Sequence, residues 1–153
     1  MEKYLQQQKT DCIKIVLFGP ESTGKTSLAV ELAKHYKTLF VKEFAREFLQ
    51  KKMDEQNKVC EIDDLIPIAI GQMNSENILS KKANRILFCD TDLLTTATYS
   101  RLYFNNFCDP VIDKYSKENK YDLYLLLDID IPWVKDDLRD RPNDRKLFLE
   151  KFK

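Results

Sequence analysis

The sequence predicts an α/β domain of three layers, in which a mostly parallel sheet is covered by helices on both faces. Short apolar runs alternate along the chain with segments whose apolar residues recur at helical spacing. These runs are apolar throughout, which is typical of strands buried on both faces of a parallel sheet. The length of 153 residues suits one such domain.

The expected strands are the apolar runs. The first, residues 13–19, reads Ile-Lys-Ile-Val-Leu-Phe-Gly and is rich in β-branched residues. A short candidate follows at 39–42, and further apolar runs lie at 85–90 and 123–127. Because ligands bind beyond the carboxyl ends of parallel strands, the residues just after these runs are the first candidates for a site.

Helical periodicity fills the intervals between these runs. In the segment 25–37, apolar residues recur at helical spacing from Leu28 to Tyr36. The longest periodic segment is 62–83, and Asp63 and Asp64 suit its N-terminal turn. Further helices are expected at 43–52, 92–104 and 109–118. Residues 1–11 form a polar N-terminal arm, residues 12–153 the domain.

Composition excludes several function classes. Charged residues make up 33% of the chain, but the formal net charge is zero, which argues against nucleic acid and membrane surfaces as partners. The chain has no apolar stretch of membrane-spanning length and no apolar leader. The four cysteines form no C-x-x-C pair, and the single His35 excludes sites that need two histidines. We expect a cytoplasmic protein with reduced thiols.

The best-defined motif follows the first expected strand and contains two of the three glycines of the chain. Residues 19–26 read Gly-Pro-Glu-Ser-Thr-Gly-Lys-Thr, a complete match to G-x-x-x-x-G-K-[ST] between a strand and a helix. The backbone N–H groups of such a P-loop cradle phosphates at the helix N-terminus. Lys25 is expected to reach the β- and γ-phosphates, and the Thr26 hydroxyl to bind Mg²⁺.

Two acids lie at the end of the run at 85–90 and just after it. Asp90 stands at the carboxyl end of the expected strand, where P-loop proteins place the Asp that organises Mg²⁺, and Asp92 is a second candidate. The alternative for either acid is a helix N-cap or a loop position. Asp92, three residues before Thr95, is itself a candidate cap.

Further candidates are residues that could contact the molecule that receives the phosphoryl group. Glu43 follows the strand at 39–42, where a carboxylate can take a hydroxyl proton or hold a sugar, and Arg46 and Glu47 share its helix face. A surface ion-pair ladder is the structural alternative. Gln72 can read a nucleobase or carboxamide through its amide, or lie at the polar edge of the apolar stripe.

Three arginines near the C-terminus, Arg139, Arg141 and Arg145, offer the positive charge that a transferring phosphoryl group needs. The aspartates between residues 136 and 144 offer the alternative of a neutralised, solvated face.

Five blocks of sequence together resemble one family. They are the P-loop at 19–26, Val-Lys-Glu-Phe-Ala-Arg-Glu at 41–47, Ile-Ala-Ile-Gly-Gln at 68–72, Asp-Thr-Asp-Leu-Leu-Thr-Thr at 90–96, and a block at 121–134 that ends Asp-Ile-Pro-Trp-Val. In order and spacing they are similar to the ribosylnicotinamide kinase domain of NadR-type proteins, over about residues 12 to 152. In the family, Pro-Trp-Val is usually followed by Asp-Gly and then an Arg. In this chain the corresponding stretch is Asp136-Asp137-Leu138-Arg139, which lacks the glycine.

The resemblance implies a P-loop nucleoside kinase fold and transfer of the γ-phosphate of ATP to the 5′-hydroxyl of nicotinamide riboside, giving nicotinamide mononucleotide in NAD biosynthesis. ATP and Mg²⁺ are the implied cofactors, and a small nucleoside is the implied partner. Glu43 and Arg46 would line the nucleoside site, Asp90 and Asp92 would lie at the metal and acceptor, and the arginines would belong to a lid at about 133–146.

The expected site residues fall into four groups. The catalytic candidates are Lys25, Glu43, Asp92, Arg139 and Arg145. The residues expected to bind ATP and its phosphates are Gly19, Glu21, Ser22, Thr23, Gly24, Lys25, Thr26, Ser27 and Arg141. The nucleoside candidates are Glu43, Arg46, Gln72 and Asp92, and the metal candidates are Thr26 and Asp90.

Two other functions stay open: a nucleotide-binding ATPase or sensor module that regulates a partner, and a kinase for another nucleoside or nucleotide. P-loop kinases usually add a further strand and helix near the adenine, but this sequence stops at Lys153. We therefore expect either an omitted tail or an unusually short protein without that last strand. The adenine contacts and the oligomeric state are left unassigned.

Overall fold

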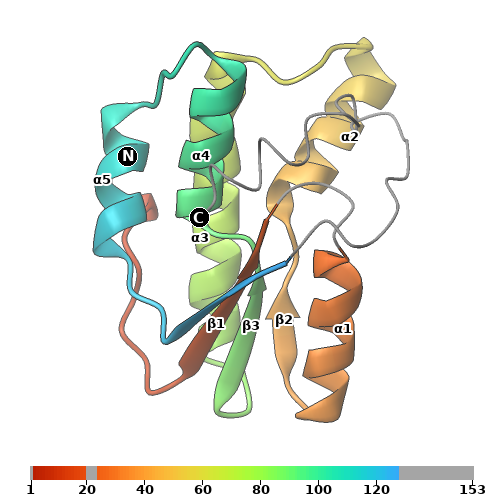
Figure 1. Cartoon of the computed structure of the whole chain (residues 1–153), viewed down its shortest axis with the longest axis vertical. Coiled ribbons are helices and arrows are strands. Elements are labelled where there is room, and N and C mark those ends of the chain that lie inside the picture. The colour runs from red at the N-terminus through yellow and green to blue at the C-terminus, as the bar shows by residue number, and fades with distance from the viewer. Residues whose placement is uncertain (1, 20–23, 128–153) are drawn as a thin grey trace.

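The computed structural model describes residues 2–19 and 24–127, and within them it contains a sheet in the order β2-β3-β1-β4. The strands are β1 (Ile13–Phe18), β2 (Leu39–Val41), β3 (Ile86–Asp90) and β4 (Leu123–Leu126). Each of the three pairings is parallel (Figure 1). The predicted α/β fold with a parallel sheet is confirmed.

The register of the strands brings their carboxyl ends to one edge of the sheet. Leu17 pairs with Asp90, and Phe18 pairs with Leu126. The central strand β3 reaches slightly further than β2, in which Val41 pairs with Cys89. The loops that follow β1, β2 and β3 therefore start from neighbouring positions, which is where a parallel sheet binds ligands.

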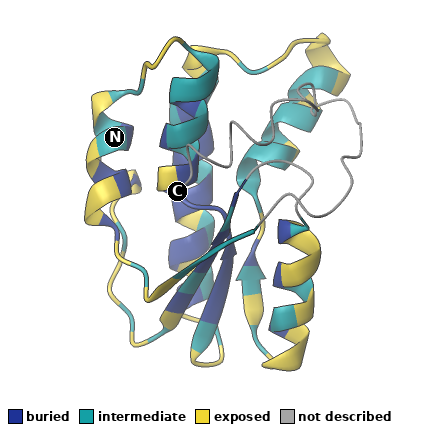
Figure 2. Cartoon of the chain, viewed as in Figure 1, coloured by how far each residue is buried: buried dark blue, intermediate teal, exposed yellow. Residues whose placement is uncertain are grey.

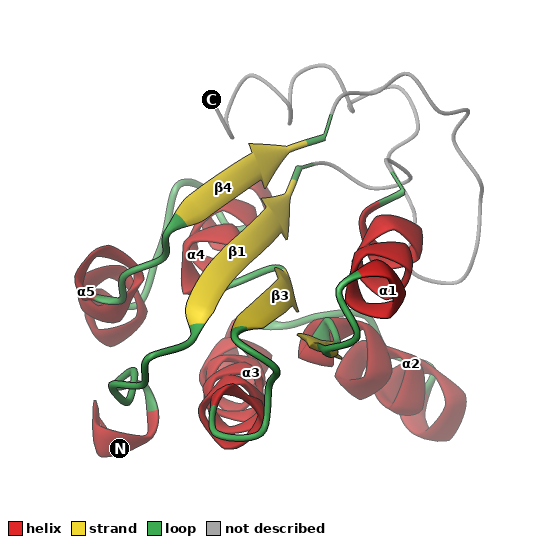
Figure 3. Ribbon diagram, turned by 90° about the horizontal axis from the view of Figure 1, so that it is seen from below, coloured by secondary structure: helices red, strands yellow, loops and turns green. Residues whose placement is uncertain are grey.

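Helices cover both faces of the sheet, with α1 (Lys25–His35) on one side and α3 (Leu65–Ser80) on the other (Figure 3). Because side chains alternate along a strand, Leu17 and Phe88 pack against α1. Val16 and Cys89 point the other way and pack on the α3 side. The three expected layers are present.

A second core lies between the helices rather than on the sheet. α3 packs against α4 (Leu93–Tyr103), and α4 packs in turn against α5 (Pro110–Glu118). Figure 2 shows burial concentrated in the central strands and on the inner sides of these helices. Leu5, which follows the short 3₁₀ helix η1 (Glu2–Tyr4), is fully buried in this core. The other buried members are Leu65, Ala69, Met73, Leu93, Ala97, Ile112 and Tyr115.

The helix predicted at 43–52 is longer in the structure. α2 runs Phe44–Gln56 and ends where Asn57 adopts a left-handed conformation with φ of 54°. The apolar pattern stops near residue 52, but the residues up to Gln56 are mostly good helix formers that continue the helix without a buried face.

The helix predicted at 62–83 is shorter and begins differently. Residues Ile62–Asp64 form a 3₁₀ turn, η2, held by a reciprocal capping box between Glu61 and Asp64. The α-helix α3 starts only at Leu65, with Pro67 tolerated in its first turn, and ends at Ser80. The remaining expected helices agree with the structure to within two residues at each end.

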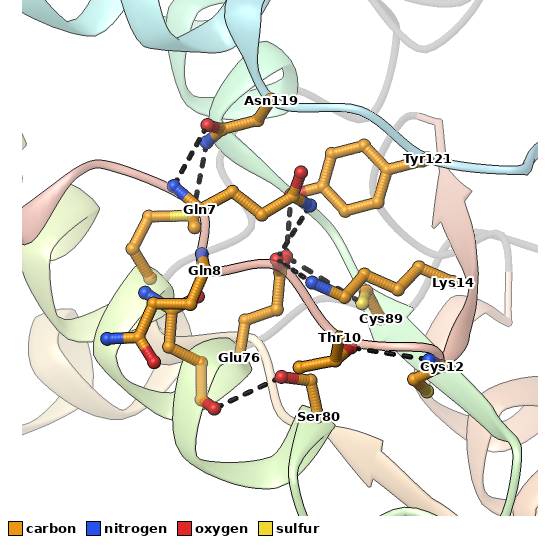
Figure 4. A network of polar contacts seen from close by, with 12 residues as sticks. Gln7, Gln8, Thr10, Cys12, Lys14, Glu76, Ser80, Cys89, Asn119 and Tyr121 are labelled. Atoms are coloured by element: carbon orange, nitrogen blue, oxygen red, sulfur yellow. Dashed lines mark hydrogen bonds and ion pairs between the residues drawn. The ribbon is translucent and has the colours of Figure 1, made fainter.

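A buried ion pair joins the sheet to α3 (Figure 4). The Lys14 Nζ atom lies 3.3 Å from Glu76 Oε2, and the two residues are 5% and 1% exposed. The Tyr121 hydroxyl donates a 2.6 Å hydrogen bond to Glu76 Oε1, and the Gln7 amide donates to Oε2 at 3.1 Å. The Cys89 thiol lies 3.9 Å from Oε1, so four donors among the described residues surround the Glu76 carboxylate, as a buried charge requires.

The N-terminal segment is attached to the core by paired amide contacts (Figure 4). The Gln7 N–H donates to Asn119 Oδ1 at 3.3 Å, and the Gln8 N–H donates to Asn77 Oδ1 at 2.9 Å. Asn77 is on α3 and Asn119 follows α5. The segment thus bridges two elements that are distant in sequence.

The described helices include none with the length and apolar character needed to cross a membrane. All four cysteines are free thiols, and Cys89 is fully buried.

Candidate nucleotide-binding site

The candidate site lies at the carboxyl edge of the sheet, where three chain segments leave neighbouring strands. Gly19 follows β1, Glu43 follows β2, and Asp90 is the last residue of β3. The topology therefore brings together the P-loop, the Glu43 segment and the acids after β3, as the sequence predicted.

The two glycines of the P-loop occupy positions that a side chain would disturb. Gly19 has φ of 141°, and a Cβ placed there would lie 2.9 Å from the Leu127 carbonyl oxygen. Gly24 has φ of 84° and directly precedes α1. Both backbone conformations belong to the region that glycine adopts without strain. Glu21, Ser22 and Thr23 lie outside the described residues.

Lys25 folds back over the start of the loop. It is the first residue of α1, is 8% exposed, and its Nζ donates a 3.1 Å hydrogen bond to the Gly19 carbonyl oxygen. The ammonium group is thus held at the mouth of the loop, close to the helix N-terminus where phosphates bind. Thr26 and Ser27 follow in the exposed first turn of α1.

Thr26 and Asp90 are joined by a short side-chain contact. The Thr26 hydroxyl donates a 2.6 Å hydrogen bond to Asp90 Oδ2. Asp90 is fully buried, and its Oδ1 atom has no hydrogen-bond partner among the described residues. Burial raises the pKa of Asp90, partly offset by the Thr26 hydrogen bond and the charge of Lys25.

This pair fits a magnesium ion. A hydroxyl and a carboxylate are oxygen ligands of the kind that Mg²⁺ takes together with phosphate oxygens and water. The unpartnered Oδ1 atom of Asp90 leaves a lone-pair site for a cation or its water. Among residues 2–19 and 24–127, no three His, Cys, Asp or Glu side chains form a group that could hold a metal.

Asp92 is the N-cap of α4, the alternative that its sequence context offered. Its Oδ1 accepts 3.0 Å hydrogen bonds from the backbone N–H and the hydroxyl of Thr95. Its Oδ2 accepts a 2.9 Å hydrogen bond from the Tyr124 hydroxyl. Asp92 is 2% exposed, and burial raises its pKa despite these hydrogen bonds. Both of its oxygens are therefore engaged within the protein.

Thr91, between the two acids, has an unusual backbone. Its φ of 78° lies in the left-handed region, which a β-branched residue rarely adopts, and its N–H donates to the Leu17 carbonyl oxygen at 3.1 Å. Thr91 thus separates two acids that have different surroundings. Asp90 contacts Thr26 of α1, whereas Asp92 contacts Tyr124. Strained residues of this kind cluster at functional sites.

The Glu43 segment rests against α3. Glu43 and Arg46 are half-buried at the start of α2. Gln72, expected beside the apolar stripe, is instead 2% exposed, and its Oε1 accepts a 2.9 Å hydrogen bond from the Phe44 N–H. Its Nε2 is buried and has no hydrogen-bond partner among the described residues.

Two features of the site were not anticipated. Tyr124 holds Asp92, and Gly71 provides the space for the Phe44 ring. The glycine within a helical pattern was the available signal for the second, whereas nothing in the spacing of Tyr124 singles it out. Arg139, Arg141, Arg145 and the expected lid at 133–146 lie outside the described residues.

Comparison with known proteins gives a family and several relatives. The AAA domain family model matches residues 14–153. Two curated relatives, both the trifunctional NAD biosynthesis/regulator protein NadR, come from Salmonella typhimurium and from Escherichia coli strain K12. Each is 31% identical over 139 residues, an alignment that covers 88% of this chain and 33% of the relative. The chain thus spans about one third of the length of the curated relatives it matches.

Two solved structures resemble the fold over 92% of this chain at 28% identity. One is a crystal structure of NadR protein in complex with NR, with a TM-score of 0.77 and 41% of that chain covered. The other is of NadR protein in complex with NAD and AMP-PNP, with a TM-score of 0.73 and 39% covered.

Proposed function

This chain belongs to the AAA domain family, and from that membership and its confirmed resemblance to NadR we propose that it is a nicotinamide riboside kinase. The reaction transfers the γ-phosphate of ATP to the ribose 5′-hydroxyl and releases ADP. The observation that carries the proposal is the Thr26–Asp90 contact at the start of α1, beside the buried Lys25. The ligands of the two NadR structures, NR and AMP-PNP, are of the kinds expected for an acceptor and an ATP analogue.

The P-loop side of the site binds the phosphates of ATP. The N-terminus of α1 faces the phosphates, and Lys25 moves from the Gly19 carbonyl oxygen to a phosphate oxygen. Thr26 and Asp90 hold Mg²⁺, which when bound neutralises charge on the β- and γ-phosphates. Glu21, Ser22, Thr23 and Ser27 complete this proposed set.

The catalytic base lies on the side of the proposed site that binds the acceptor nucleoside. We assign it to Glu43 rather than Asp92, because both Asp92 oxygens accept hydrogen bonds from Thr95 and Tyr124. Glu43 takes the proton of the 5′-hydroxyl as the oxygen attacks the γ-phosphorus in line with the leaving ADP. Asp92 then acts by holding the start of α4 near the acceptor.

Other residues complete the proposed acceptor site. Arg46, on the first turn of α2, contacts the nucleoside, and Gln72 lies behind it. Arg139, Arg141 and Arg145 are proposed to supply charge to the transferring phosphoryl group from a lid.

The direct test is ADP release measured with a panel of nucleosides and nucleotides. Nicotinamide riboside is expected to give turnover well above the rate without acceptor, and the Lys25→Met variant is expected to lose it. Lys25→Met keeps the aliphatic stem, so its circular dichroism should match the wild type. Turnover with a different acceptor alone would overturn the substrate. Nucleotide binding without any acceptor-dependent ADP release would instead favour an ATPase or sensor module.

A second comparison separates the two candidate bases. Glu43→Gln is expected to lower kcat. Asp92→Asn is expected to act mainly on stability, because it alters the cap of α4. A larger loss of kcat in Asp92→Asn than in Glu43→Gln would reverse the assignment.

A further inference from the structure

The first turn of α2 is held by a side chain from another helix. The Glu43 side chain makes no capping hydrogen bond to α2, although it occupies the N-cap position. The first N–H groups of a helix have no partner within that helix. In this helix the Phe44 N–H donates to Gln72 Oε1 of α3, 28 residues along the chain, at 2.9 Å.

The ring of the same residue is held by the neighbouring position of α3. A Cβ placed on Gly71 would lie 2.2 Å from Phe44 Cε1 and 2.3 Å from Phe44 Cζ. The ring therefore occupies the space that any other residue at position 71 would fill. It also packs against Phe48 one turn later, with ring centroids 6.1 Å apart.

Two consecutive residues of α3 thus position Phe44: Gln72 accepts a hydrogen bond from its backbone N–H, and Gly71 leaves space for its ring. We define Gly71 and Gln72 as the α2 seat. α3 itself is anchored in the core by its neighbours Ala69 and Met73, which are fully buried. The position of Phe44 is therefore set by a helix that is packed in the core.

The burial of the polar Gln72 side chain is energetically unfavourable, and packing alone does not explain why Gln72 stands at this position. The side chain is 2% exposed, and its Nε2 atom has no hydrogen-bond partner among the described residues. A buried unpaired donor is unfavourable, and an apolar side chain of the same size would avoid it. Among the described residues, the hydrogen bond that the Gln72 side chain does make is the one to the start of α2.

From these contacts we infer that Gly71 and Gln72 are positioning residues that set where Glu43 stands relative to the acceptor hydroxyl. The inference rests on the proposed function, in which Glu43 is the base. The Cα atoms of adjacent residues are about 3.8 Å apart, so a shift of Phe44 moves Glu43 with it. Misplacement of a catalytic group by about 1 Å can lower the rate roughly 100-fold.

The test compares Gln72→Met and Gly71→Ala in the full chain, with Asn74→Ala as the matched control. Asn74 is exposed on the same helix. Steady-state kinetics use ATP and nicotinamide riboside. Each seat variant is expected to lower kcat roughly 10- to 100-fold while the KM for ATP stays unchanged, because the P-loop is not part of the seat. Asn74→Ala should match the wild type in both constants.

Two further measurements distinguish positioning from general damage. Hydrogen exchange at the Phe44 amide, followed by NMR, should accelerate in Gln72→Met but not in Asn74→Ala. In a double-mutant cycle, Gly71→Ala should not lower kcat any further in a Phe44→Ala background, because the ring that the new methyl group would displace is absent. An equal loss in both backgrounds would overturn the steric part of the inference.

The outcomes separate this inference from the proposed function. Wild-type kcat and unchanged Phe44 exchange in Gln72→Met would overturn the seat while leaving the kinase intact. A parallel rise of the KM for ATP would show a general disturbance of the site and also overturn positioning. A wild-type protein without acceptor-dependent turnover would overturn the proposed function, and exchange at the Phe44 amide would then decide the seat by itself.

Discussion

The Thr26 hydroxyl donates a hydrogen bond of 2.6 Å to the Asp90 carboxylate, linking the first turn of α1 to the end of β3. The two residues are 64 positions apart in sequence, yet the parallel pairing of β1 with β3 places them side by side. The fold itself therefore brings the two proposed magnesium ligands together.

Replacing Asp90 by Asn is expected to abolish phosphoryl transfer while preserving the fold. The amide keeps an oxygen that can accept from Thr26, but it lacks the charge that holds Mg²⁺. Losing one preorganised electrostatic group in an active site typically lowers kcat roughly 100-fold or more. Coupled ADP release with nicotinamide riboside measures the effect.

Variants at Thr26 provide the control for that experiment. Thr26→Ser keeps the hydroxyl and should retain most of the turnover, whereas Thr26→Val keeps the shape and should behave like Asp90→Asn. Wild-type turnover in Asp90→Asn would rule out the metal assignment.

Much of the fold was predictable because local patterns determine it. The apolar run ending at Asp90 identifies a strand, and the P-loop motif identifies the helix that begins at Lys25. Parallel pairing then brings the two together without further information. The cap role of Asp92 was also visible in the sequence as an alternative, because Thr95 stands three residues later.

The unpredicted features depend on partners that are distant in sequence. Leu5 lies in a polar segment whose few apolar residues show no period from which burial could be predicted, yet it is fully buried. Gln72 was expected at the polar edge of the apolar stripe, but it is buried, as is Glu76 one turn later, because their partners come from other elements. Periodicity shows which face of a helix is apolar but not which polar groups the rest of the fold presents to it.

Removing the amine of Lys14 is expected to destabilise the protein strongly. Glu76 is 1% exposed, and Lys14→Met leaves its carboxylate with the neutral donors Tyr121, Gln7 and Cys89. Breaking a buried ion pair by deleting one partner typically costs about 3–5 kcal/mol. Chemical denaturation of wild type and variant measures the free energy of unfolding.

The double variant Lys14→Met/Glu76→Gln is the informative partner of that experiment. It removes both charges, so its loss of stability should be smaller than the sum of the two single losses. Additive losses would show that Lys14 and Glu76 act independently and that their 3.3 Å contact contributes little.

Truncating Leu5 is expected to show that the N-terminal segment is part of the core. The side chain is fully buried in the cluster between α3, α4 and α5. A Leu→Ala change in such a position typically costs about 2–5 kcal/mol. Tyr4→Ala is the matched control, because Tyr4 is 53% exposed and its loss should cost about 0.5 kcal/mol or less. Similar unfolding midpoints for the two variants would contradict the packing of Leu5.

The contact between α4 and α5 should give a pH-dependent contribution to stability. The Arg101 guanidinium donates to Asp113 Oδ1 at 2.5 Å, and Lys117 Nζ lies 3.1 Å from Oδ2. These hydrogen bonds, that of Arg101 first, lower the pKa of Asp113 below its usual value of 3.8. A carboxylate with a lowered pKa in the folded state stabilises the protein above that usual value, and the contribution is lost as the pH falls through the lowered pKa.

Asp113→Asn is therefore expected to lower the free energy of unfolding at neutral pH by at most about 1 kcal/mol, since the pair is partly exposed to solvent. The difference from the wild type should shrink as the pH falls below 3.8, and it should also shrink at high salt. Denaturant titrations at several pH values and two ionic strengths measure it, with Asp11→Asn as a control at an exposed acid. A difference that persists unchanged in acid would mean that Asp113 acts by capping or packing rather than through its charge.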